Sequence, residues 1–402
     1  MESQERMVGT VSRGVRAPII RQGDDIVSIV VDSVLRAAET EGFALRDRDV
    51  VAVTEAVVAR AQGNYATVDQ IASDVRAKLG GETVGIVFPI LSRNRFSICL
   101  KGIATGAKKV IIQLSYPADE VGNHLIDDDV LDESGIDPWK DVLDEKAWRD
   151  TFGYTVHPFT GVDYIAFYKE LVESCGAECE FLFANDPSAI LTKTGNVLAC
   201  DIHTRARTKK KLIKAGAERC FLLTDILSAP VDGSGYNAAY GLLGTNKATE
   251  DKVKLFPRDC ERVVSAIAAG LYEKTGKRIE AMVYGDGAFK DPVGKIWELA
   301  DPVVSPAYTP GLAGTPNELK LKFLADNDYK DLSGEALREA IRSRIRQKDG
   351  SSLVGNMVAE GTTPRQLTDL IGSLCDLTSG SGDKGTPIVL IQGYFDNYTS
   401  EK

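Results

Sequence analysis

Between residues 86 and 230 the sequence repeats one pattern, in which a helix-forming stretch is followed by a glycine and then by a short apolar run. It occurs three times, as KGIATGAKKVIIQLS (101–115), KELVESCGAECEFLFAND (169–186) and KKLIKAGAERCFLLTD (210–225). Glycine is common just after a helix, because it adopts the left-handed backbone without steric cost. Helices that alternate with buried strands over loops this short form right-handed βαβ crossovers. The pattern therefore predicts an α/β unit with a parallel sheet of at least three strands.

The ends of these strands are candidate ligand positions, because open parallel sheets bind ligands beyond the carboxyl ends of their strands. The ends are Ser115-Tyr116, Asn185-Asp186 and Thr224-Asp225. Asp186 and Asp225 either face a ligand or cap the segments that follow them, and both interpretations stay open.

The flanking segments alternate helices and strands less regularly. Asp24 or Asp25 is expected to cap a helix at 26–35, and a strand at 50–53 leads into a helix at 54–61. Further helices are predicted at 258–274, 335–347 and 364–377, and further strands at 278–284 and 388–392. A length of 402 residues is consistent with two to three units. We therefore expect an α/β protein whose mixed-sheet core, residues 1–85 and 231–402, is interrupted by the inserted unit 86–230.

Charge and cysteine content restrict the partners and the compartment. The chain has 48 basic and 58 acidic residues, a net charge of −10, which repels nucleic-acid phosphates and anionic lipids. Its seven cysteines form no Cys-x-x-Cys pair and indicate free thiols in a reducing compartment. No apolar run approaches ~18 residues, and the N-terminus lacks a hydrophobic signal segment. We predict a cytoplasmic protein with neither a nucleic-acid nor a membrane partner.

Tyr284-Gly285-Asp286-Gly287 is the first candidate site. Two glycines around one acid at a strand end let the backbone turn sharply while the carboxylate points outward. Such a carboxylate suits a hard cation such as Mg²⁺, which takes one or two carboxylates together with substrate phosphates. An ordinary aspartate in a tight turn is the alternative interpretation.

The loop 379–387, Ser-Gly-Ser-Gly-Asp-Lys-Gly-Thr-Pro, is the second candidate. Its backbone N–H groups, at Gly380, Gly382 and Gly385, together with Lys384, could surround a phosphate. The order of a Walker A loop is absent, and the segment precedes a strand instead of a helix.

Other polar groups carry weaker signals. The loop 232–251 offers the oxygen donors Asp232, Asn237, Asn246, Glu250 and Asp251. Six acids, Asp119, Glu120, Asp127, Asp128, Asp129 and Asp132, form with His124 either a metal patch or a solvated face. The basic run 205–214 either coats a helix or meets an anionic substrate. Three scattered histidines are too few for a zinc site, and no Gly-x-Ser-x-Gly elbow supports a serine triad.

Several of these stretches together resemble the coenzyme F420-0:L-glutamate ligase family, which acts on a deazaflavin coenzyme. The similarity covers about half of the chain in three ordered blocks. Its motifs are Pro18-Ile-Ile-Arg-Gln-Gly-Asp-Asp25, Arg48-Asp-Val-Val-Ala-Val-Thr-Glu-Ala-Val-Val-Ala-Arg-Ala-Gln-Gly63, Gly244-Thr-Asn246, Thr275-Gly-Lys-Arg-Ile-Glu-Ala-Met-Val-Tyr-Gly-Asp-Gly287 and Leu377-Thr-Ser-Gly-Ser-Gly-Asp-Lys-Gly-Thr-Pro-Ile-Val-Leu-Ile-Gln-Gly393.

This resemblance implies a GTP-dependent ligase that joins L-glutamate to a small-molecule carboxylate acceptor through an acyl phosphate, with Mg²⁺ or Mn²⁺. Asp286 then falls where the family binds metal, and its flanking glycines would leave room for phosphate and ion. Catalytic roles are implied for Arg60, Lys290 and Lys384. Asp291, like Lys290, lies where the family has polar residues. Phosphate-binding roles are implied for Gly285, Gly287 and the glycines of the 380–385 loop. A homodimer is also implied.

The chain also departs from the family pattern. Asn246 stands where the family has a metal-binding aspartate, so its metal ligand would be a neutral carbonyl oxygen. The segment 86–230 has no counterpart that we could match in short family members and could reshape the acceptor pocket. Three alternatives therefore stay open: a γ-glutamyl ligase for a folate-type acceptor, a metal-dependent phosphohydrolase, and a nucleotide-binding regulator without turnover.

Overall fold

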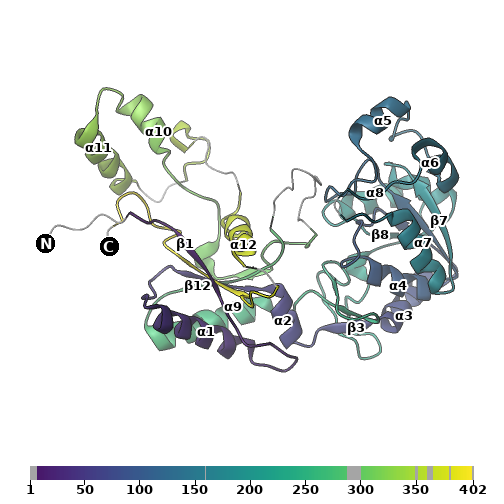
Figure 1. The fold of residues 1–402 in the computed structure, drawn as a ribbon, viewed down its shortest axis with the longest axis horizontal. Helices are drawn as coiled ribbons and strands as arrows, with labels where there is room; N and C mark the ends of the chain where they lie inside the picture. Colours follow the sequence, from purple (N-terminus) through teal and green to yellow (C-terminus); the bar gives the residue numbers. More distant parts are fainter. Residues whose placement is uncertain are drawn as a thin grey trace.

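The computed structural model describes residues 7–158, 160–287, 300–348, 352–359, 365–379 and 382–400. These residues form three sheets with helices packed around them, which confirms the expected α/β fold with a mixed sheet and a parallel sheet. Figure 1 shows the five-stranded sheet with its helices on one side of the molecule and the six-stranded sheet with its helices on the other.

The five-stranded sheet is mixed. Its strands lie in the order β1 (Val11–Val15), β14 (Ile388–Gln392), β2 (Val50–Thr54), β12 (Glu280–Tyr284) and β13 (Ala307–Tyr308). β2 and β12 are parallel, whereas the other neighbours pair antiparallel. The N-terminal and C-terminal parts of the chain thus share one sheet.

Both faces of this sheet are buried, as alternating side chains show. On β2, Val51 and Val53 point into the core beneath α1 (Ile26–Glu41) and α9 (Cys260–Thr275). Val50 and Ala52 point to the opposite face, which α12 (Leu367–Thr378) covers. The predicted helices and strands of this part are present, although α1 continues to Glu41, where Gly42 ends it with a φ of 68°.

The six-stranded sheet has the order β6 (Leu143–Asp144), β7 (Glu178–Phe183), β5 (Lys109–Leu114), β4 (Thr83–Val87), β8 (Asn196–Ala199) and β9 (Arg219–Leu222). All neighbours are parallel except β6 and β7. The chain adds strands on one side of β4 and then continues on the other side with β8. Such a reversal of strand order opens a crevice at the carboxyl ends of β4 and β8, the two strands between which the order reverses.

Helices cover both faces of this sheet. One core lies beneath α3 (Val68–Leu79), α4 (Ser97–Thr105) and α7 (Tyr164–Ser174), and its side chains range from Ala66 to Leu255. A smaller core lies beneath α8 (Arg205–Lys214). α5 (Asp128–Ser134) and α6 (Glu145–Phe152) follow β5. The boundaries at 85/86 and 230/231 stay predictions.

Smaller elements complete the described fold. The three-stranded sheet consists of β3 (Tyr65–Thr67), β11 (Lys252–Lys254) and β10 (Asn246–Lys247). Its strand β3 follows α2 (Glu55–Ala61) in the chain. α10 (Leu321–Phe323) and α11 (Gly334–Arg346) share a separate small apolar cluster. The short 3-10 or π turns are η1 (Pro187–Thr192), η2 (Leu223–Asp225), η3 (Pro310–Leu312), η4 (Leu324–Asp328) and η5 (Met357–Ala359).

Two general expectations can be compared with this fold. All seven cysteines are free thiols, four of them buried, as predicted. Within the described ranges, no helix has both the length and the apolar character that a membrane crossing requires.

Candidate functional site

A cavity of about 1180 Å³ lies between the ends of the two large sheets. On one side it is lined by α2, the end of β12 and the 379–387 loop. On the other side it is lined by the 90–95 loop, which follows β4 at the point where the strand order reverses, and by residues of the 246–254 segment. The cavity therefore joins segments that are far apart in the sequence.

Most of the predicted site residues that the structure describes line this one cavity. They are Arg60, Asn246, Gly285, Asp286, Gly382 and Gly385. Gly287 and the exposed Lys384 lie outside its lining, and Lys290, Asp291 and Gly380 lie outside the described residues. The structure thus brings the three candidate segments together, while the role of each residue stays a prediction.

The glycines around Asp286 make room for protein groups. A side chain at Gly285 would place its Cβ 2.2 Å from Oδ2 of Asp301, and the same oxygen accepts a hydrogen bond from the Asp286 N–H at 2.6 Å. Gly287 lies against Ser373 of α12, and its N–H donates to Oδ2 of Asp376 at 2.9 Å. Asp301 and Ser373 therefore occupy the space that side chains at positions 285 and 287 would need.

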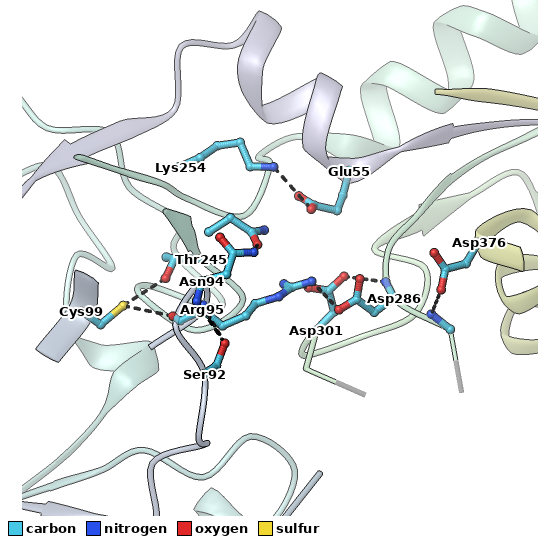
Figure 2. A network of polar contacts seen from close by, with 12 residues as sticks. Glu55, Ser92, Asn94, Arg95, Cys99, Thr245, Lys254, Asp286, Asp301 and Asp376 are labelled. Carbon is cyan, nitrogen blue, oxygen red and sulfur yellow. Dashed lines mark hydrogen bonds and ion pairs between the residues drawn. The ribbon is translucent and has the colours of Figure 1, made fainter. Parts of the chain in front are cut away.

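Arg95 binds this acidic turn from the six-stranded-sheet side. Its guanidinium donates through Nη2 to Asp286 and through Nη1 to Asp301, and Figure 2 shows the side chain extended toward both carboxylates. The Asp301 side chain is 1% exposed and that of Arg95 is 13% exposed. Burial alone would lower the pKa of Arg95, but the carboxylates of Asp301, Asp286 and Glu55 raise it above its ordinary value. Arg95 is therefore a fixed positive charge in the site.

Glu55, the first residue of α2, is a buried carboxylate that lines the same cavity. Its Oε1 lies 3.5 Å from Nζ of Lys254, and its Oε2 has no hydrogen-bond partner within the described part of the chain. Burial raises the pKa of Glu55, and the charge of Lys254 acts against this shift. Burial likewise raises the pKa of Asp376.

The Gly244-Thr245-Asn246 segment is held by the loop after β4 and by α4. Oδ1 of Asn246 accepts a hydrogen bond from Nδ2 of Asn94 at 2.9 Å. Thr245 and Cys99 are hydrogen-bonded through their hydroxyl and thiol at 3.0 Å. The Asn246 oxygen that we expected to face a metal thus already accepts a protein hydrogen bond.

The charged residues of the described cavity lining are mainly basic. Six basic residues face three acidic ones: Arg60, Arg93, Arg95, Lys247, Lys252 and Lys254 against Glu55, Asp286 and Asp376. The whole chain, in contrast, carries a net charge of −10. Positive charge in a concave site attracts anions locally, even when the rest of the molecule repels them.

The sequence model of the family described as F420-0:Gamma-glutamyl ligase matches residues 14–393. The chain belongs to this family. The match is wider than the three blocks recognised in the sequence and runs through the six-stranded sheet. No curated protein matches the chain.

The family resemblance implies a divalent metal, but the observed acid pair does not fit one. Asp286 and Asp301 each give an oxygen to Arg95, and Asp301 gives its other oxygen to a backbone N–H. Among the described residues no group of three or more His, Cys, Asp and Glu side chains could hold a metal ion. Arg95 supplies the positive charge instead.

The weaker candidates have structural roles in the described ranges. Asp186 caps η1, which favours the capping interpretation for this residue. Asp225 ends η2 and accepts hydrogen bonds from the Leu222 N–H before it and from Nζ of Lys209, so these bonds do not cap a following segment. Glu120 accepts hydrogen bonds from three consecutive N–H groups, those of residues 202–204, ahead of α8. Asp119 is buried and accepts hydrogen bonds from the backbone of Leu91, among others. The 119–133 segment is therefore not simply a solvated acidic face.

Sequence reasoning missed Arg95, Glu55, Lys254, Asp301 and Asp376 as site residues. One signal could have found Arg95, because its loop follows the apolar run Val84–Val87, another parallel-strand end. The same strand-end rule was applied only to the three later strands. Asp301 and Asp376 carry no comparable signal in this ligase family member.

Proposed function

We propose that this protein is a GTP-dependent γ-glutamyl ligase, which adds L-glutamate to a carboxylate of coenzyme F420-0 or a related acceptor. The observation that carries the proposal is the excess of basic over acidic residues in the cavity of an acidic member of the F420-0 γ-glutamyl ligase family. All three reactants are anions, so they need local positive charge to enter and stay. A volume of about 1180 Å³ exceeds the usual range of small-molecule sites, roughly 300–1,000 Å³, which suits a site for more than one reactant.

The proposed reaction has two steps. First, a carboxylate oxygen of the acceptor attacks the γ-phosphorus of GTP, which forms an acyl phosphate and releases GDP. Next, the amino group of glutamate attacks the acyl carbon. The amide bond forms, the C–O bond to phosphate breaks, and the amine proton passes to a base or to water while inorganic phosphate leaves. Both steps spread negative charge over oxygens, so fixed positive groups stabilise them.

In this proposal the chain's own residues position the anions. Arg60 and Lys254 line the cavity as cations. Gly382 and Gly385 line it too, and the Gly385 N–H donates to the Gly382 carbonyl at 3.3 Å, so a phosphate contact of this loop remains a proposal from the turn chemistry. Lys384 and Lys290 remain candidates for contact with the transferred group. Mg²⁺ or Mn²⁺ remains part of the proposal through the family resemblance, and we assign no step to it.

We propose that the acceptor contacts the side of the cavity that lies next to the six-stranded sheet, which is called the acceptor wall below. This wall contains Arg93, Val121, Asn123, Thr160 and Tyr164, a mixture of basic, apolar and aromatic groups. A deazaflavin or a folate both offer an aromatic ring system and a carboxylate to such a wall. Deazaflavin is the first choice because the family acts on F420-0.

Two further parts of the proposal concern the protein in the cell. Seven free thiols support a reducing, cytoplasmic location. The homodimer rests on the family resemblance, and light scattering of the purified protein would measure it directly.

Mass spectrometry of the acceptor tests the activity. The protein is incubated with glutamate, GTP or ATP, Mg²⁺ or Mn²⁺, and a deazaflavin or a folate acceptor, with a reaction that lacks nucleotide as the control. We expect a glutamate-sized mass gain on the deazaflavin that requires GTP. A gain only on the folate would identify the alternative ligase. Nucleotide consumption without any gain would instead indicate a phosphohydrolase, and nucleotide binding without consumption a regulator.

A further inference from the structure

Glu55 presents an unusual carboxylate in the wall of the cavity. Its side chain is only 5% exposed, and it begins α2 directly after β2. One oxygen, Oε1, lies 3.5 Å from Nζ of Lys254, a contact that Figure 2 draws as a dashed line. The other oxygen, Oε2, is buried and has no hydrogen-bond partner in the part of the chain that the structure describes. A buried oxygen without a partner costs free energy, so it calls for a ligand or a chemical role.

The carboxylates of the cavity gather around Arg95. Asp286 and the buried Asp301 each accept a hydrogen bond from its guanidinium. The charges of Arg95 and Asp301 affect the pKa of Glu55. The same two charges affect the pKa of Asp376. We call these four acids, Glu55, Asp286, Asp301 and Asp376, the acidic corner. When they are ionised, four carboxylates share one guanidinium, and even the ammonium group that contacts Glu55 leaves an excess of negative charge.

This excess of negative charge suits a cationic ligand. Among the proposed reactants, L-glutamate brings an ammonium group, whereas its own carboxylates, GTP and the carboxylate of the acceptor are negative. An ammonium donates up to three hydrogen bonds and accepts none, which matches carboxylate oxygens. The last torsion of a glutamate side chain is broad, so either oxygen of Glu55 can turn toward a donor in the cavity.

We propose that Glu55 binds the amino group of L-glutamate and acts as the base that frees this group for attack. The inference rests on the proposed ligase function and assigns a residue to its second step. The carboxylate of Glu55 takes one proton from the ammonium. The nitrogen lone pair then forms the C–N bond to the acyl carbon, the C–O bond to phosphate breaks, and phosphate leaves as HPO₄²⁻ with a second proton from the nitrogen. Glu55 finally passes its proton to water.

The surroundings of Glu55 suit a base that works near neutral pH. Burial raises the pKa of Glu55 above its ordinary value of 4.5, and a base is most effective when its pKa lies near the working pH. The charges of Lys254 and Arg95 act against this shift, whereas that of Asp301 adds to it. Cys260, whose pKa burial raises to about 12, stays neutral in this range. The kcat/KM for glutamate should therefore fall at low pH as Glu55 is protonated, and Glu55→Gln should lack this acidic limb.

Hydroxylamine separates the two steps of the reaction. It is uncharged at neutral pH, so it attacks an acyl phosphate without prior removal of a proton and leaves a hydroxamate on the acceptor. Wild type and Glu55→Gln are incubated with GTP, Mg²⁺ and the deazaflavin acceptor, together with either glutamate or hydroxylamine, and mass spectrometry measures both products. Because a general base typically contributes 100-fold or more, Glu55→Gln should lower kcat/KM for glutamate by about 100-fold. It should still form the hydroxamate as fast as wild type does.

Asp376→Asn is the matched control, because it removes another carboxylate of the acidic corner that lines the cavity. We expect it to lower kcat/KM for glutamate much less than Glu55→Gln does. Equal losses would mean that the negative charge of the whole corner matters, and the role of Glu55 as a base would be wrong.

Glu55→Asp, which keeps a carboxylate, should recover part of the glutamate activity and the acidic limb. It also decides the question if thermal unfolding shows that Glu55→Gln does not fold, because it too should slow glutamate addition more than hydroxamate formation. Unchanged glutamate addition by the folded variants, or an equal loss of both products, would overturn the inference. If wild type itself forms neither product, the ligase proposal fails instead.

Discussion

Gly285 shows how closely the residues of the acidic turn are packed. Its N–H donates to the Val304 carbonyl at 2.8 Å, while the Asp301 carboxylate occupies the space of a missing side chain. The glycine pattern in the sequence indicated an unusual turn with an outward aspartate. The physical reason for a glycine at position 285, however, is the buried carboxylate of Asp301, which comes from a later segment.

Gly285→Ala should therefore destabilise the protein. The added methyl group would overlap Asp301 Oδ2, so the carboxylate must move away from the Asp286 N–H and from Arg95. Overpacking of this kind costs about 1–3 kcal/mol in the free energy of unfolding. Urea unfolding of the variant beside wild type measures this cost.

Gly382→Ala is the matched control for this substitution. Gly382 lines the same cavity, but a Cβ there would meet no atom within 4 Å. We expect its free energy of unfolding to stay within about 0.5 kcal/mol of wild type. Equal losses at both positions would show that Gly285 has no special need for a missing side chain.

Asp286 could be found from sequence, but its pairing with Arg95 could not. The turn chemistry of Gly-Asp-Gly is local, so it is visible in four consecutive residues. Arg95 is an arginine in a polar loop, and nothing within that loop indicates a carboxylate 191 positions away. Which charges meet in a site depends on tertiary packing, and a single sequence does not display it.

At the scale of elements, local rules predicted three of the five strands of the mixed sheet, β2, β12 and β14, but not β1 or β13. β2 and β14 are buried on both faces, and their apolar runs are unbroken. The helix α3 was not predicted, although Thr67 and Gln70 form a capping box at its start. Helix periodicity alone does not decide whether such a segment forms a helix. Its apolar stripe stabilises the helix only when it packs against a sheet, and the sequence does not show that contact.

The first helix offers a direct test of a predicted cap. Asp25 accepts hydrogen bonds from the N–H groups of Val27 and Ser28, whereas Asp24 bonds outside the helix, to the Arg21 N–H. Asp25→Ala should lower the free energy of unfolding by about 1 kcal/mol at pH 7. Asp32→Ala, which changes the same charge at an exposed position inside α1, should change it by less than about 0.5 kcal/mol.

The contribution of Asp25 should also depend on pH. Hydrogen bonds from the Ser28 side chain and backbone lower the pKa of Asp25 below its ordinary value of 3.8. A lowered pKa in the folded state means that the stabilisation is present above pH 3.8 and is lost as the pH falls through the lower, folded-state pKa. The difference between wild type and Asp25→Ala should shrink over that acidic range. A pH-independent difference would indicate a cause other than the charged cap.

At the scale of the whole molecule, the sequence predicted two kinds of sheet but not how they meet. The βαβ pattern indicated a parallel sheet, and the three candidate segments were recognised one by one. Their convergence on one cavity depends on where the strand order reverses at β4 and β8, which directs the 90–95 loop toward α2 and β12. Strand order is set by packing between elements, so local patterns leave it open.

The contrast between an acidic chain and a basic cavity leads to a last prediction. Arg60 is exposed at the end of α2 and lines the cavity. A hydrogen bond to a charged phosphate contributes roughly 1.5–3 kcal/mol, so Arg60→Ala should weaken GTP binding about tenfold or more in isothermal titration calorimetry. Lys214→Ala, an exposed position on α8 outside the cavity lining, should leave the affinity unchanged.

The dependence of GTP affinity on salt concentration distinguishes attraction by the cavity cations from repulsion by the net charge of the whole chain. Raising the ionic strength from about 0.05 to 0.5 M shortens the screening length from more than 10 Å to less than 8 Å. If the cavity cations hold GTP, wild-type affinity should fall with salt, and Arg60→Ala should show a smaller fall because one of these cations is missing. If the repulsion from the acidic chain dominated instead, added salt would strengthen binding. The sign of the salt dependence therefore decides whether the cavity, rather than the net charge, governs how this molecule receives its anionic ligands.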